Sequence, residues 1–574
     1  MKIATADFET DPFQHKSVPA PFCGGVYDGT TYLHWWGTDC VKRFLEWLET
    51  LNEPHTVYFH NGGKFDFFLR DESGYRIIDR IHSQLRLING RIVYGKIGMH
   101  EVRDSYAILP FPLKDFSTHK EFDYSKMHRD NRDRNRFEIL NYLKQDCVDL
   151  FTLCNEFIVE FGDKLTIGQT SIGILKKFHP FDVGKTDFDK RFRNYYFGGR
   201  CQCFANGLLQ GPWEIVDVNS MYPAAMRNFR HPVSVQCEIT KDITPRTNFA
   251  LVIAKNYGAL PIRNTKGSLD FTQEYGEFYA TIHEINAGLA TGTLEIKRVK
   301  HAVEFKHTTT FGEFVDFYME ARNKAKHEFA ETGNQLAKAR SLFYKTLLNS
   351  SYGKFAQNGS DYMDYQLRRD NVQFPETECE YQTLSGGKVF CGECEKTKIC
   401  KKEWQIGQMA FDWILWQRPS LRPSYYNVAA AASITGAARA LLIYGLKSAV
   451  EPIYCDTDSI ICRQFNGDKD PYRLGAWKVE GNPDYVAIAG KKLYACFVGH
   501  PDNAASKCIK QASKGVTITP QEIVRLAVDP FARIDHANQA PKFRLDGKVQ
   551  FVSRKVRKTA VFKGRQRLGR RLFP

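Results

Sequence analysis

The sequence predicts a multidomain protein that combines α/β and α+β architecture. Three observations lead to this expectation. The chain has 574 residues, which is more than a single domain usually contains. Strand-like apolar runs alternate with long amphipathic stretches along the sequence. Closely spaced carboxylates lie in or beside strand-like runs near the start of the chain and again near residue 456, so we expect two separate acidic sites.

The composition favours a polyanionic partner and argues against a membrane protein. The net charge is +15, which suits nucleic acid, although the charge could also serve solubility alone. The 15 cysteines form no framework pattern, so we expect reduced thiols in a cytosol. The first residues have no apolar signal core, and no apolar run is long enough to span a bilayer. The alanine-rich stretch Val428–Leu446 is interrupted by Ser433, Thr435 and Arg439, which predicts a tightly packed helix of a soluble protein.

The first strand-like stretch carries two carboxylates. Lys2–Thr10 alternates like a strand, so Asp7 and Glu9 point to the same face of it. A second strand-like run enters a Gly-Gly turn, and Asp66 comes directly after that turn. For any one of these side chains a solvated surface position is the simpler explanation, but their recurrence beside β-type runs indicates a shared site.

A predicted helix completes the acidic set. Phe137–Phe161 has the apolar spacing of an amphipathic helix, with Tyr142 and Asp146 on one helix face. Four carboxylates suit phosphodiester hydrolysis with two metal ions about 3.5–4 Å apart, which would activate a water and stabilise the leaving oxygen. In such a site Tyr142 could orient the water.

A hairpin is predicted at Tyr454–Ser459, between two apolar β-type runs. Its turn holds Asp456 and Asp458, whose like charges are costly to desolvate unless a cation joins them. Mg²⁺ takes carboxylate and phosphate oxygens as ligands. The alternative is an exposed polar hairpin tip, since Asp and Thr suit turns.

Two further stretches could complete a nucleotide site. The strand-like run in Glu214–Pro223 ends at Asp217, which could be the third carboxylate beside the hairpin. Tyr222 would then lie near a nucleotide sugar, where a flat ring leaves no room for a 2′-hydroxyl. The alternative for Tyr222 is a core position.

The stretch Lys345–Gly353 is predicted to be helical, with Lys345, Asn349 and Tyr352 on one face. A cation, an amide and an aromatic ring on one face make a plausible surface for a nucleotide, and Gly353 would permit close approach of a base pair. Lys338 falls on the same face and could assist. An ordinary amphipathic surface helix is the alternative.

In this order the motifs resemble those of family B DNA polymerases, and the chain length and spacing are similar to the protein-primed branch found in bacteriophages. D-x-E, N-x-x-x-F-D and Y-x-x-x-D resemble the three exonuclease motifs of proofreading polymerases. D-x-x-S-x-Y-P, K-x-x-x-N-S-x-Y-G and Y-C-D-T-D-S resemble polymerase motifs A, B and C. Tyr196–Arg200 resembles the Y-x-G-G motif, for which a plain turn is the alternative, and Lys491–Tyr494 resembles the K-x-Y motif.

The resemblance implies two catalytic centres and assigns residues to each. The catalytic residues would be Asp217, Asp456 and Asp458 for synthesis, and Asp7, Glu9, Asp66, Tyr142 and Asp146 for hydrolysis. Mg²⁺, which Mn²⁺ could replace, would be held by Asp217, Val218 and Asp458 in one centre and by Asp7, Glu9, Asp66 and Asp146 in the other. The incoming nucleotide would contact Tyr222, Lys345, Asn349, Tyr352 and Gly353.

The resemblance also implies DNA contacts. The single-stranded 3′ end would contact Thr10, His60, Asn61, Phe65 and Ser105, the template Tyr196, Gly198 and Gly199, and the primer side Lys492 and Tyr494. Phe65 would supply a stacking face. A structural role is equally plausible for His60. Lys126 is the weakest match, to an exonuclease-site lysine.

The implied fold is an RNase H-like 3′-5′ exonuclease domain followed by a right-hand polymerase with two insertions. The expected parts are an exonuclease domain (1–165), a first part of the palm (166–226), a first terminal-protein-region insertion (227–320), fingers (321–355), a second such insertion (356–420), a second part of the palm (421–512) and a thumb (513–574). The implied activity is proofreading DNA synthesis that copies a linear viral genome by protein-primed strand displacement. Expected partners are template-primer DNA, dNTPs and a terminal protein, for a monomer in the cytoplasm of an infected bacterial host.

Two rival functions were weighed against this one: a nuclease with a degenerate polymerase body, and a non-catalytic nucleic-acid scaffold. The first is opposed by the intact polymerase-motif residues Asp217, Tyr222, Lys345, Asp456 and Asp458. The second is opposed by two complete carboxylate sets, each costly to keep without a metal. Cys379, Cys391, Cys394 and Cys400 have partial zinc-knuckle spacing, but the irregular distance to the other cysteines makes structural zinc the weaker expectation. The stretch Phe551–Pro574 is basic and free of acids, and we expect it to bind DNA phosphates or to be a disordered tail.

Overall fold

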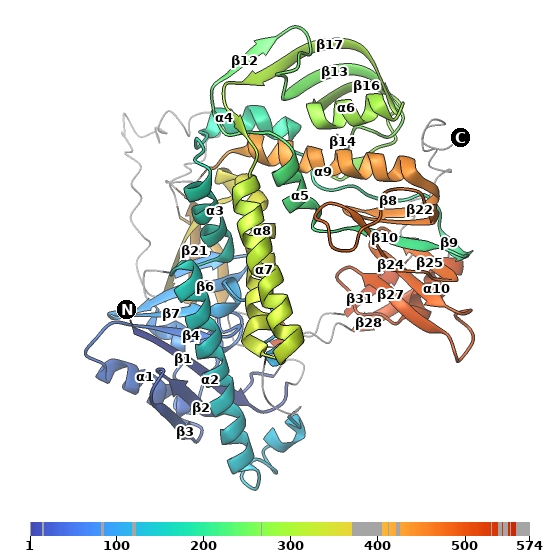
Figure 1. Cartoon of the computed structure of the whole chain (residues 1–574). Helices are drawn as coiled ribbons and strands as arrows, with labels where there is room; N and C mark the ends of the chain where they lie inside the picture. Colours follow the sequence, from blue (N-terminus) through green and yellow to red (C-terminus); the bar gives the residue numbers. More distant parts are fainter. Residues whose placement is uncertain are drawn as a thin grey trace, which may run out of the picture.

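The computed structural model describes residues 2–13, 17–81, 85–116, 122–265, 267–369, 404–410, 413–420, 425–529, 531–537, 542–543, 549–550 and 553–557. An N-terminal domain lies at one end of the molecule, an inserted β-sheet at the other, and a pair of long helices runs between them (Figure 1). Two further β-sheets, from the middle and the C-terminal part of the chain, lie beside the helix pair (Figure 1).

The N-terminal domain is built on a seven-stranded sheet of order β3-β2-β1-β4-β7-β6-β5. Its strands are β1 (Lys2–Thr10), β2 (Pro21–Tyr27), β3 (Tyr32–Trp36), β4 (His55–Phe59), β5 (Leu85–Ile88), β6 (Arg91–Ile97) and β7 (His100–Asp104). Strand β4 pairs in parallel with β1 and β7, and the other pairs are antiparallel. Helix α1 (Cys40–Thr50) buries Val41, Phe44 and Leu48 at helical spacing against this sheet. Helix α2 (Arg136–Phe161) packs on β1 and β2 and extends beyond the sheet.

The central sheet has five strands in the order β24-β10-β23-β22-β8. They are β8 (Cys201–Cys203), β10 (Glu214–Val218), β22 (Ala449–Asp456), β23 (Ser459–Phe465) and β24 (Trp477–Gly481). Helices α5 (Met221–Asn228) and α9 (Val428–Ser448) pack beside it. Helix α9 is the one described helix that is long and apolar enough to cross a membrane, but 89% of its apolar window is buried inside the protein, as expected for a core helix.

The inserted sheet follows α5 in the chain and has the order β12-β17-β13-β16. Its strands are β12 (Cys237–Thr240), β13 (Phe249–Asn256), β16 (Tyr275–Thr281) and β17 (Leu294–Phe305), and α6 (Ile282–Ala290) covers one face. Thr281 and Glu284 form a capping box at the start of α6. The core of this part includes Ala440 and Ile443 of α9, so the insertion is anchored on the central helix.

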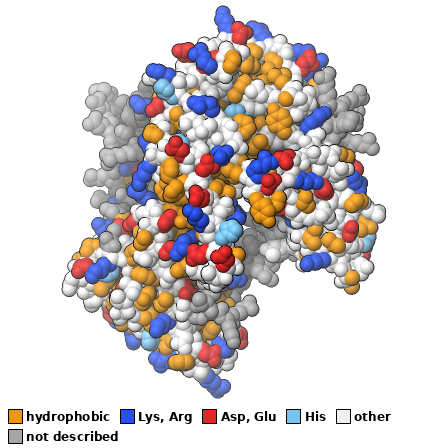
Figure 2. Space-filling view, in the orientation of Figure 1, with side chains coloured by type: hydrophobic (Ala, Val, Ile, Leu, Met, Phe, Trp, Pro, Cys, Tyr) orange, Lys and Arg blue, Asp and Glu red, His pale blue; other side chains and the backbone are white. Residues whose placement is uncertain are grey.

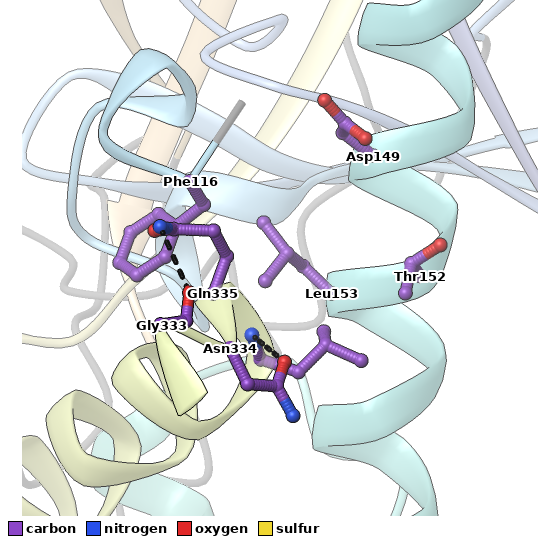
Figure 3. Close-up of a pocket in the computed structure, with 8 residues that line it drawn as sticks. Phe116, Asp149, Thr152, Leu153, Gly333, Asn334 and Gln335 are labelled. Carbon is purple, nitrogen blue, oxygen red and sulfur yellow. Dashed lines mark hydrogen bonds between the residues drawn. The ribbon is translucent and has the colours of Figure 1, made fainter. Parts of the chain in front are cut away.

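A helical hairpin consists of α7 (Gly312–Thr332) and α8 (Gln335–Phe355), joined at Gly333, whose φ of +69° suits glycine at a helix end. Along its length α8 packs on α3 (Ile167–Phe178) and α2. Phe343 of α8 contacts Phe111 and Phe157. The guanidinium of Arg340, also on α8, lies 2.6 Å from the Glu156 carboxylate of α2. A small pocket lies where the hairpin tip meets α2 and Phe116 (Figure 3).

The C-terminal part forms a four-stranded sheet of order β27-β26-β25-β9, covered by α10 (Pro520–Val528). Its strands are β9 (Gly207–Gln210), β25 (Tyr485–Gly490), β26 (Leu493–Val498) and β27 (Lys507–Ser513). A three-stranded sheet of order β19-β21-β20 packs its Leu367, Trp413 and Leu415 into the N-terminal core. The remaining elements are β19 (Met363–Arg369), β20 (Gln405–Ala410), β21 (Trp413–Pro419), α4 (Thr186–Phe192), β11 (His231–Pro232), β14 (Ile262–Arg263), β15 (Leu269–Asp270), β18 (Thr308–Thr309), β28 (Arg533–Ala537), β29 (Lys542–Phe543), β30 (Val549–Gln550) and β31 (Ser553–Arg557).

Two candidate active sites

The first site is a cluster of carboxylates in the N-terminal domain. Asp7 and Glu9 lie on β1, which pairs in parallel with the central strand β4, and Asp146 faces them from α2. The ligand atoms of these three residues all lie within 4.8 Å of one another. Asp66 opens a 3₁₀ turn, Asp66–Phe68, and interacts electrostatically with both β1 carboxylates. The four side chains that the sequence predicts to share a site are therefore neighbours.

Burial without a cation leaves these carboxylates in an unfavourable state. Burial, with repulsion from the neighbouring carboxylates, raises the pKa of Asp7 well above its usual value and that of Glu9 to about 8. Burial also raises the pKa of Asp66 to about 8 and that of Asp146 to about 6. Glu9 Oε1 and Asp66 Oδ1 are buried and have no hydrogen-bond partner among the described residues. Unpartnered buried oxygens within a carboxylate cluster are the donor set that Mg²⁺ takes, so these residues fit divalent cations.

Aromatic side chains cover the same cluster. The Tyr142 ring stacks on Phe122 with centroids 4.5 Å apart, and its hydroxyl lies 3.2 Å from that of Tyr124. Burial, with the Asp146 charge nearby, raises the pKa of Tyr142, so its hydroxyl stays protonated and can hold a water. Lys126 pairs with Glu138 instead of a cluster carboxylate. Tyr124 was not singled out from the sequence, where one tyrosine in a loop gives no signal.

The predicted 3′-end contacts line one edge of the sheet. Asn61 has a left-handed φ of +66°, and the Asp104 carboxylate accepts hydrogen bonds from the backbone N–H groups of Asn61 and Gly63. The Arg91 guanidinium binds both Asp104 and the Asn61 side chain. Sequence reasoning missed Arg91 and Asp104, which lie 30 and 43 residues beyond Asn61 and carry no motif.

The other 3′-end residues have defined neighbours. Nδ1 of His60 lies 3.0 Å from Ser105 Oγ, and burial lowers the pKa of this histidine to about 4, so the ring is neutral at pH 7. The Phe65 ring meets Phe13 edge to face at 5.1 Å. Thr10 is buried at a β-bulge that follows Glu9. The structure thus places these residues beside the carboxylate cluster and leaves their contacts with DNA untested.

The second site lies on the central sheet. Asp217 is the penultimate residue of β10, opposite Ser459 of β23, and the N–H of Val218 donates to the Asp458 carbonyl oxygen at 2.7 Å. Burial and the Asp458 charge raise the pKa of Asp217 to about 6, and burial raises the pKa of Asp458. The ammonium of Lys478 lies 3.5 Å from Asp217. Two part-buried carboxylates that repel one another again form a donor set suited to a divalent cation.

The third carboxylate of this site, Asp456, has a different partner. Nζ of Lys492 lies 2.6 Å and 2.5 Å from the two Asp456 oxygens, while the backbone N–H of Lys492 donates to the Tyr454 hydroxyl. Tyr494 is buried against Tyr454, with ring centroids 4.8 Å apart. The structure thus brings Asp217 and Asp458 together and holds Asp456 on the lysine of the predicted primer-side motif.

The nucleotide-binding candidates face this sheet from α5 and α8. The rings of Tyr222 and Tyr352 stack with centroids 4.0 Å apart and an interplanar angle of 11°. Lys345 and Asn349 are exposed on α8, and a Cβ added at Gly353 would meet no atom within 4 Å. Lys338 instead donates to the Asp115 carbonyl oxygen at 2.7 Å, so it joins the hairpin to the N-terminal domain.

Cations from α7 add to this surface and were not predicted. Arg322 donates to the Ser220 hydroxyl at 3.3 Å, and burial lowers its pKa. Lys326 lies close enough to Arg322, Lys345 and Lys478 for their charges, after burial, to lower its pKa. The helical spacing of positions 322 and 326 was visible in the sequence, but only the fold shows that this face of α7 meets α8 and β24.

The segment Tyr196–Arg200, here called the glycine loop, contacts the turn between β22 and β23. A Cβ added at Gly199 would lie 2.8 Å from the Thr457 side chain, and the N–H of Thr457 donates to the Arg200 carbonyl oxygen at 2.6 Å. Gly198 is open on its Cβ side. The four cysteines considered for zinc, together with most of the basic C-terminal stretch, lie outside the residues that the structure describes.

Comparisons with known proteins agree with this arrangement. A family model described as DNA polymerase type B, organellar and viral, matches residues 118–388. The DNA-directed DNA polymerase of Enterobacteria phage PRD1 is 43% identical, over 97% of this chain and 98% of its own length. The DNA polymerase of Bacillus phage Nf is 24% identical, over 82% of this chain and 83% of its own. Phi29 DNA polymerase, solved with primer-template DNA, matches 97% of this chain and 100% of its own with a TM-score of 0.66 at 18% identity, a likeness of fold.

Proposed function

The chain belongs to the type B DNA polymerases of viruses and organelles and is a DNA-directed DNA polymerase, and we propose that it has two catalytic centres, one for synthesis and one for 3′-5′ proofreading. Its fold is an exonuclease domain followed by palm, fingers and thumb. The observation that carries the proposal is the separation of two carboxylate sites, one on β1 and α2 and the other on β10 and the β22–β23 hairpin.

In the synthetic centre Asp217 and Asp458, with the backbone of Val218, would hold the metal ions. Bound Mg²⁺ would neutralise the triphosphate and align it with the primer 3′-hydroxyl; Mn²⁺ takes the same ligands. Lys345, Arg322 and Lys326 would supply positive charge to the phosphates, and Tyr222 would lie under the sugar. Catalysis would come from positioning and charge neutralisation.

In the hydrolytic centre Asp7, Glu9, Asp66 and Asp146 would hold the cations that activate water. Tyr142 stays protonated and can hold that water, while Phe65 offers a face for stacking a base of the frayed 3′ end. Arg91 and Asp104 fix the strained turn that carries Asn61, and a fixed turn places the strand without reference to its sequence.

Reciprocal substitutions test the two-centre proposal. Asp458→Asn should lower DNA synthesis about 100-fold or more, a loss typical of removing preorganised charge stabilisation. The same variant should keep its trimming of single-stranded DNA. Asp7→Asn combined with Glu9→Gln should do the reverse. Primer extension and release of 3′-labelled nucleotide, measured on the same preparations, check both; loss of both activities in either variant would refute the separate centres.

We further propose that the enzyme starts from a terminal protein and copies a linear viral genome with strand displacement, as a monomer in the cytoplasm of a bacterial host. This rests on the phage relatives and on the insertion between α5 and α7, to which the family resemblance assigns the docking of a terminal protein. The test is incubation with the candidate terminal protein, Mg²⁺ and labelled dATP. A protein–nucleotide adduct is expected, and its absence with the true partner would exclude protein priming while leaving polymerisation intact.

A further inference from the structure

A buried ion pair joins the insertion to helix α9, next to the glycine loop. Arg439 of α9 and Glu284 of α6 are 2% and 0% exposed, and Nε of the arginine lies 2.7 Å from Oε1 of the glutamate. The other Glu284 oxygen accepts from the N–H and the hydroxyl of Thr281 in the capping box. Both oxygens of Glu284 are therefore engaged, one by the insertion and one by the central helix.

The far side of the same guanidinium holds the loop. Nη1 of Arg439 donates to the carbonyl oxygens of Phe197 and, at 2.9 Å, of Gly198. The preceding carbonyl, of Tyr196, accepts at 2.5 Å from Arg263, which belongs to the inserted part of the chain. Three consecutive carbonyls are thus fixed by two arginines, one of them in the insertion and the other paired with it.

The contact between insertion and central helix is close at the backbone level. A Cβ added at Gly436, one turn before Arg439 on α9, would lie 2.3 Å from the Thr281 hydroxyl oxygen. Arg200, the last residue of the glycine loop, is buried, and its guanidinium donates to the Gly258 carbonyl oxygen of the insertion at 2.7 Å. The Arg200 carbonyl oxygen in turn accepts from Thr457, between the two hairpin aspartates. An unbroken series of hydrogen bonds therefore runs from the insertion through the loop to the synthetic centre.

We propose that the inserted domain braces the Tyr196–Arg200 segment beside the synthetic centre, and that Arg439, Glu284 and Arg263 are positioning residues for the primer-template. The proposal rests on the proposed function, DNA synthesis at the second site, and on the template contact that the sequence predicts for this segment. Fixing three carbonyls on one side leaves the other face of the segment in a single conformation, which lowers the entropy lost when a DNA strand binds. A protein that docks on the insertion would influence the synthetic centre through the same hydrogen bonds.

Two substitutions separate the brace from general stability. Arg439→Lys keeps the charge next to Glu284 but cannot bind two carbonyls and a carboxylate with one fork. Arg263→Met removes the bond to Tyr196 from an exposed side chain and leaves the buried pair intact. Arg246→Met is the matched control, because Arg246 is an exposed arginine of the same insertion that pairs with Glu304 and does not touch the loop.

Two measurements are made on the full chain. Hydrogen exchange of a peptide covering residues 196–200 reports the brace without DNA, and the dissociation constant for primer-template DNA reports its consequence. Both test variants should exchange faster and bind DNA about 5- to 10-fold more weakly, the loss expected for one or two charge-assisted hydrogen bonds. At saturating DNA the kcat for dATP should stay within about 2-fold in Arg263→Met, and trimming of single-stranded DNA should be unchanged in both.

Unchanged exchange at 196–200 in both variants would overturn the brace, as would an equal effect of Arg246→Met. Faster exchange with unchanged DNA affinity would support the brace but refute the template contact that the sequence predicts, and with it the positioning role. An equal loss of trimming and DNA affinity would mean general destabilisation and would also overturn the positioning role.

Discussion

Single side chains in this protein hold strained or like-charged groups in place. The Asn61 backbone stays in the left-handed region because Asp104 accepts hydrogen bonds from the backbone N–H groups of Asn61 and Gly63, and Arg91 neutralises Asp104. In the same domain Glu9 and Asp66 each have one buried oxygen without a hydrogen-bond partner in the described part of the chain. The first arrangement is complete within the chain, whereas the second requires a cation or a proton.

The carboxylate cluster predicts how metal-free stability depends on pH. The pKa of Glu9 rises from 4.5 to about 8 and that of Asp66 from 3.8 to about 8, so the folded protein binds more protons than the unfolded chain in this window. Stability from these groups is complete below pH about 4 and is lost as the pH rises through about 8. In EDTA the melting temperature should fall between pH 5.5 and pH 8.5, and Mg²⁺ should restore it at pH 8.5.

The matched control for this dependence is Glu9→Gln combined with Asp66→Asn. This variant should lose at least about 2 °C of the pH-dependent change in melting temperature. An identical pH profile in the variant and the parent protein would show that the two side chains are solvated and not confined together.

Tyr222 predicts sugar selectivity. Its ring is fixed by the stack on Tyr352, so it cannot swing away from a ribose. Tyr222→Val should raise the efficiency of rNTP relative to dNTP incorporation by about 10-fold or more, since a steric exclusion is removed. Single-nucleotide kcat/KM values for dATP and ATP measure this ratio. Tyr352→Val serves as the comparison: an equal gain there would assign the selectivity to the stack as a whole.

At the residue scale, sequence patterns located the site carboxylates but not their supports. Asp7, Glu9 and Asp146 were found because strand and helix periods fix which side chains share a face. Arg439 and Glu284 are 155 residues apart and carry no pattern, so only the folded chain shows that they meet. Lys338 had the right helical phase, but its distance along α8 brings it to Asp115 in the N-terminal domain.

At the scale of elements, long periodic segments were predicted almost to the residue. The strand expected at Lys2–Thr10 is β1, the helix expected at Phe137–Phe161 begins one residue earlier as α2, and the hairpin is β22 and β23. The domain boundaries predicted from the sequence stay predictions. The packing of α8 on α2 could not be foreseen, because an apolar stripe does not name its partner.

The contact between α8 and α2 depends on packing more than on charge. Phe343 is buried among Phe111, Phe157 and Phe161, and Phe343→Ala should destabilise the protein by about 3 kcal/mol or more. Arg340 and Glu156 are each about one third exposed, so solvent screens them, and Arg340→Met should cost less than ~1 kcal/mol. Thermal and urea unfolding of the two variants measure the difference; a larger loss from Arg340→Met would reverse this ranking.

At the scale of the whole molecule, the charge of +15 is dispersed. Figure 2 shows Lys and Arg side chains scattered over the visible face, interspersed with Asp and Glu, without a single basic patch. Composition therefore predicted a polyanionic partner but could not say where it binds. DNA affinity should come from many weak phosphate contacts along the bound DNA. Segments in which basic residues gather should contribute most to its salt dependence.

Removal of residues 558–574 tests the C-terminal contribution to that affinity. The segment contains six Lys and Arg and no acid: Lys558, Lys563, Arg565, Arg567, Arg570 and Arg571. If all six bind phosphates, the slope of log K against log salt should become shallower by up to about 5 in the truncated protein. Fluorescence anisotropy with duplex DNA at a series of NaCl concentrations measures the slope. An unchanged slope would mean that this stretch stays clear of the DNA.

The long helix α2 contributes side chains to the carboxylate cluster and also contacts helix α8. Its first half carries Tyr142 and Asp146. Its second half carries Glu156 and Glu160, which accept hydrogen bonds from Arg340 and Tyr344 of α8. With 26 residues it is a continuous helix about 39 Å long, which moves as one rigid element. Movement of α8 would therefore act on the same helix that supplies Asp146 to the carboxylate cluster of the N-terminal domain, so the two candidate sites are mechanically connected through α2.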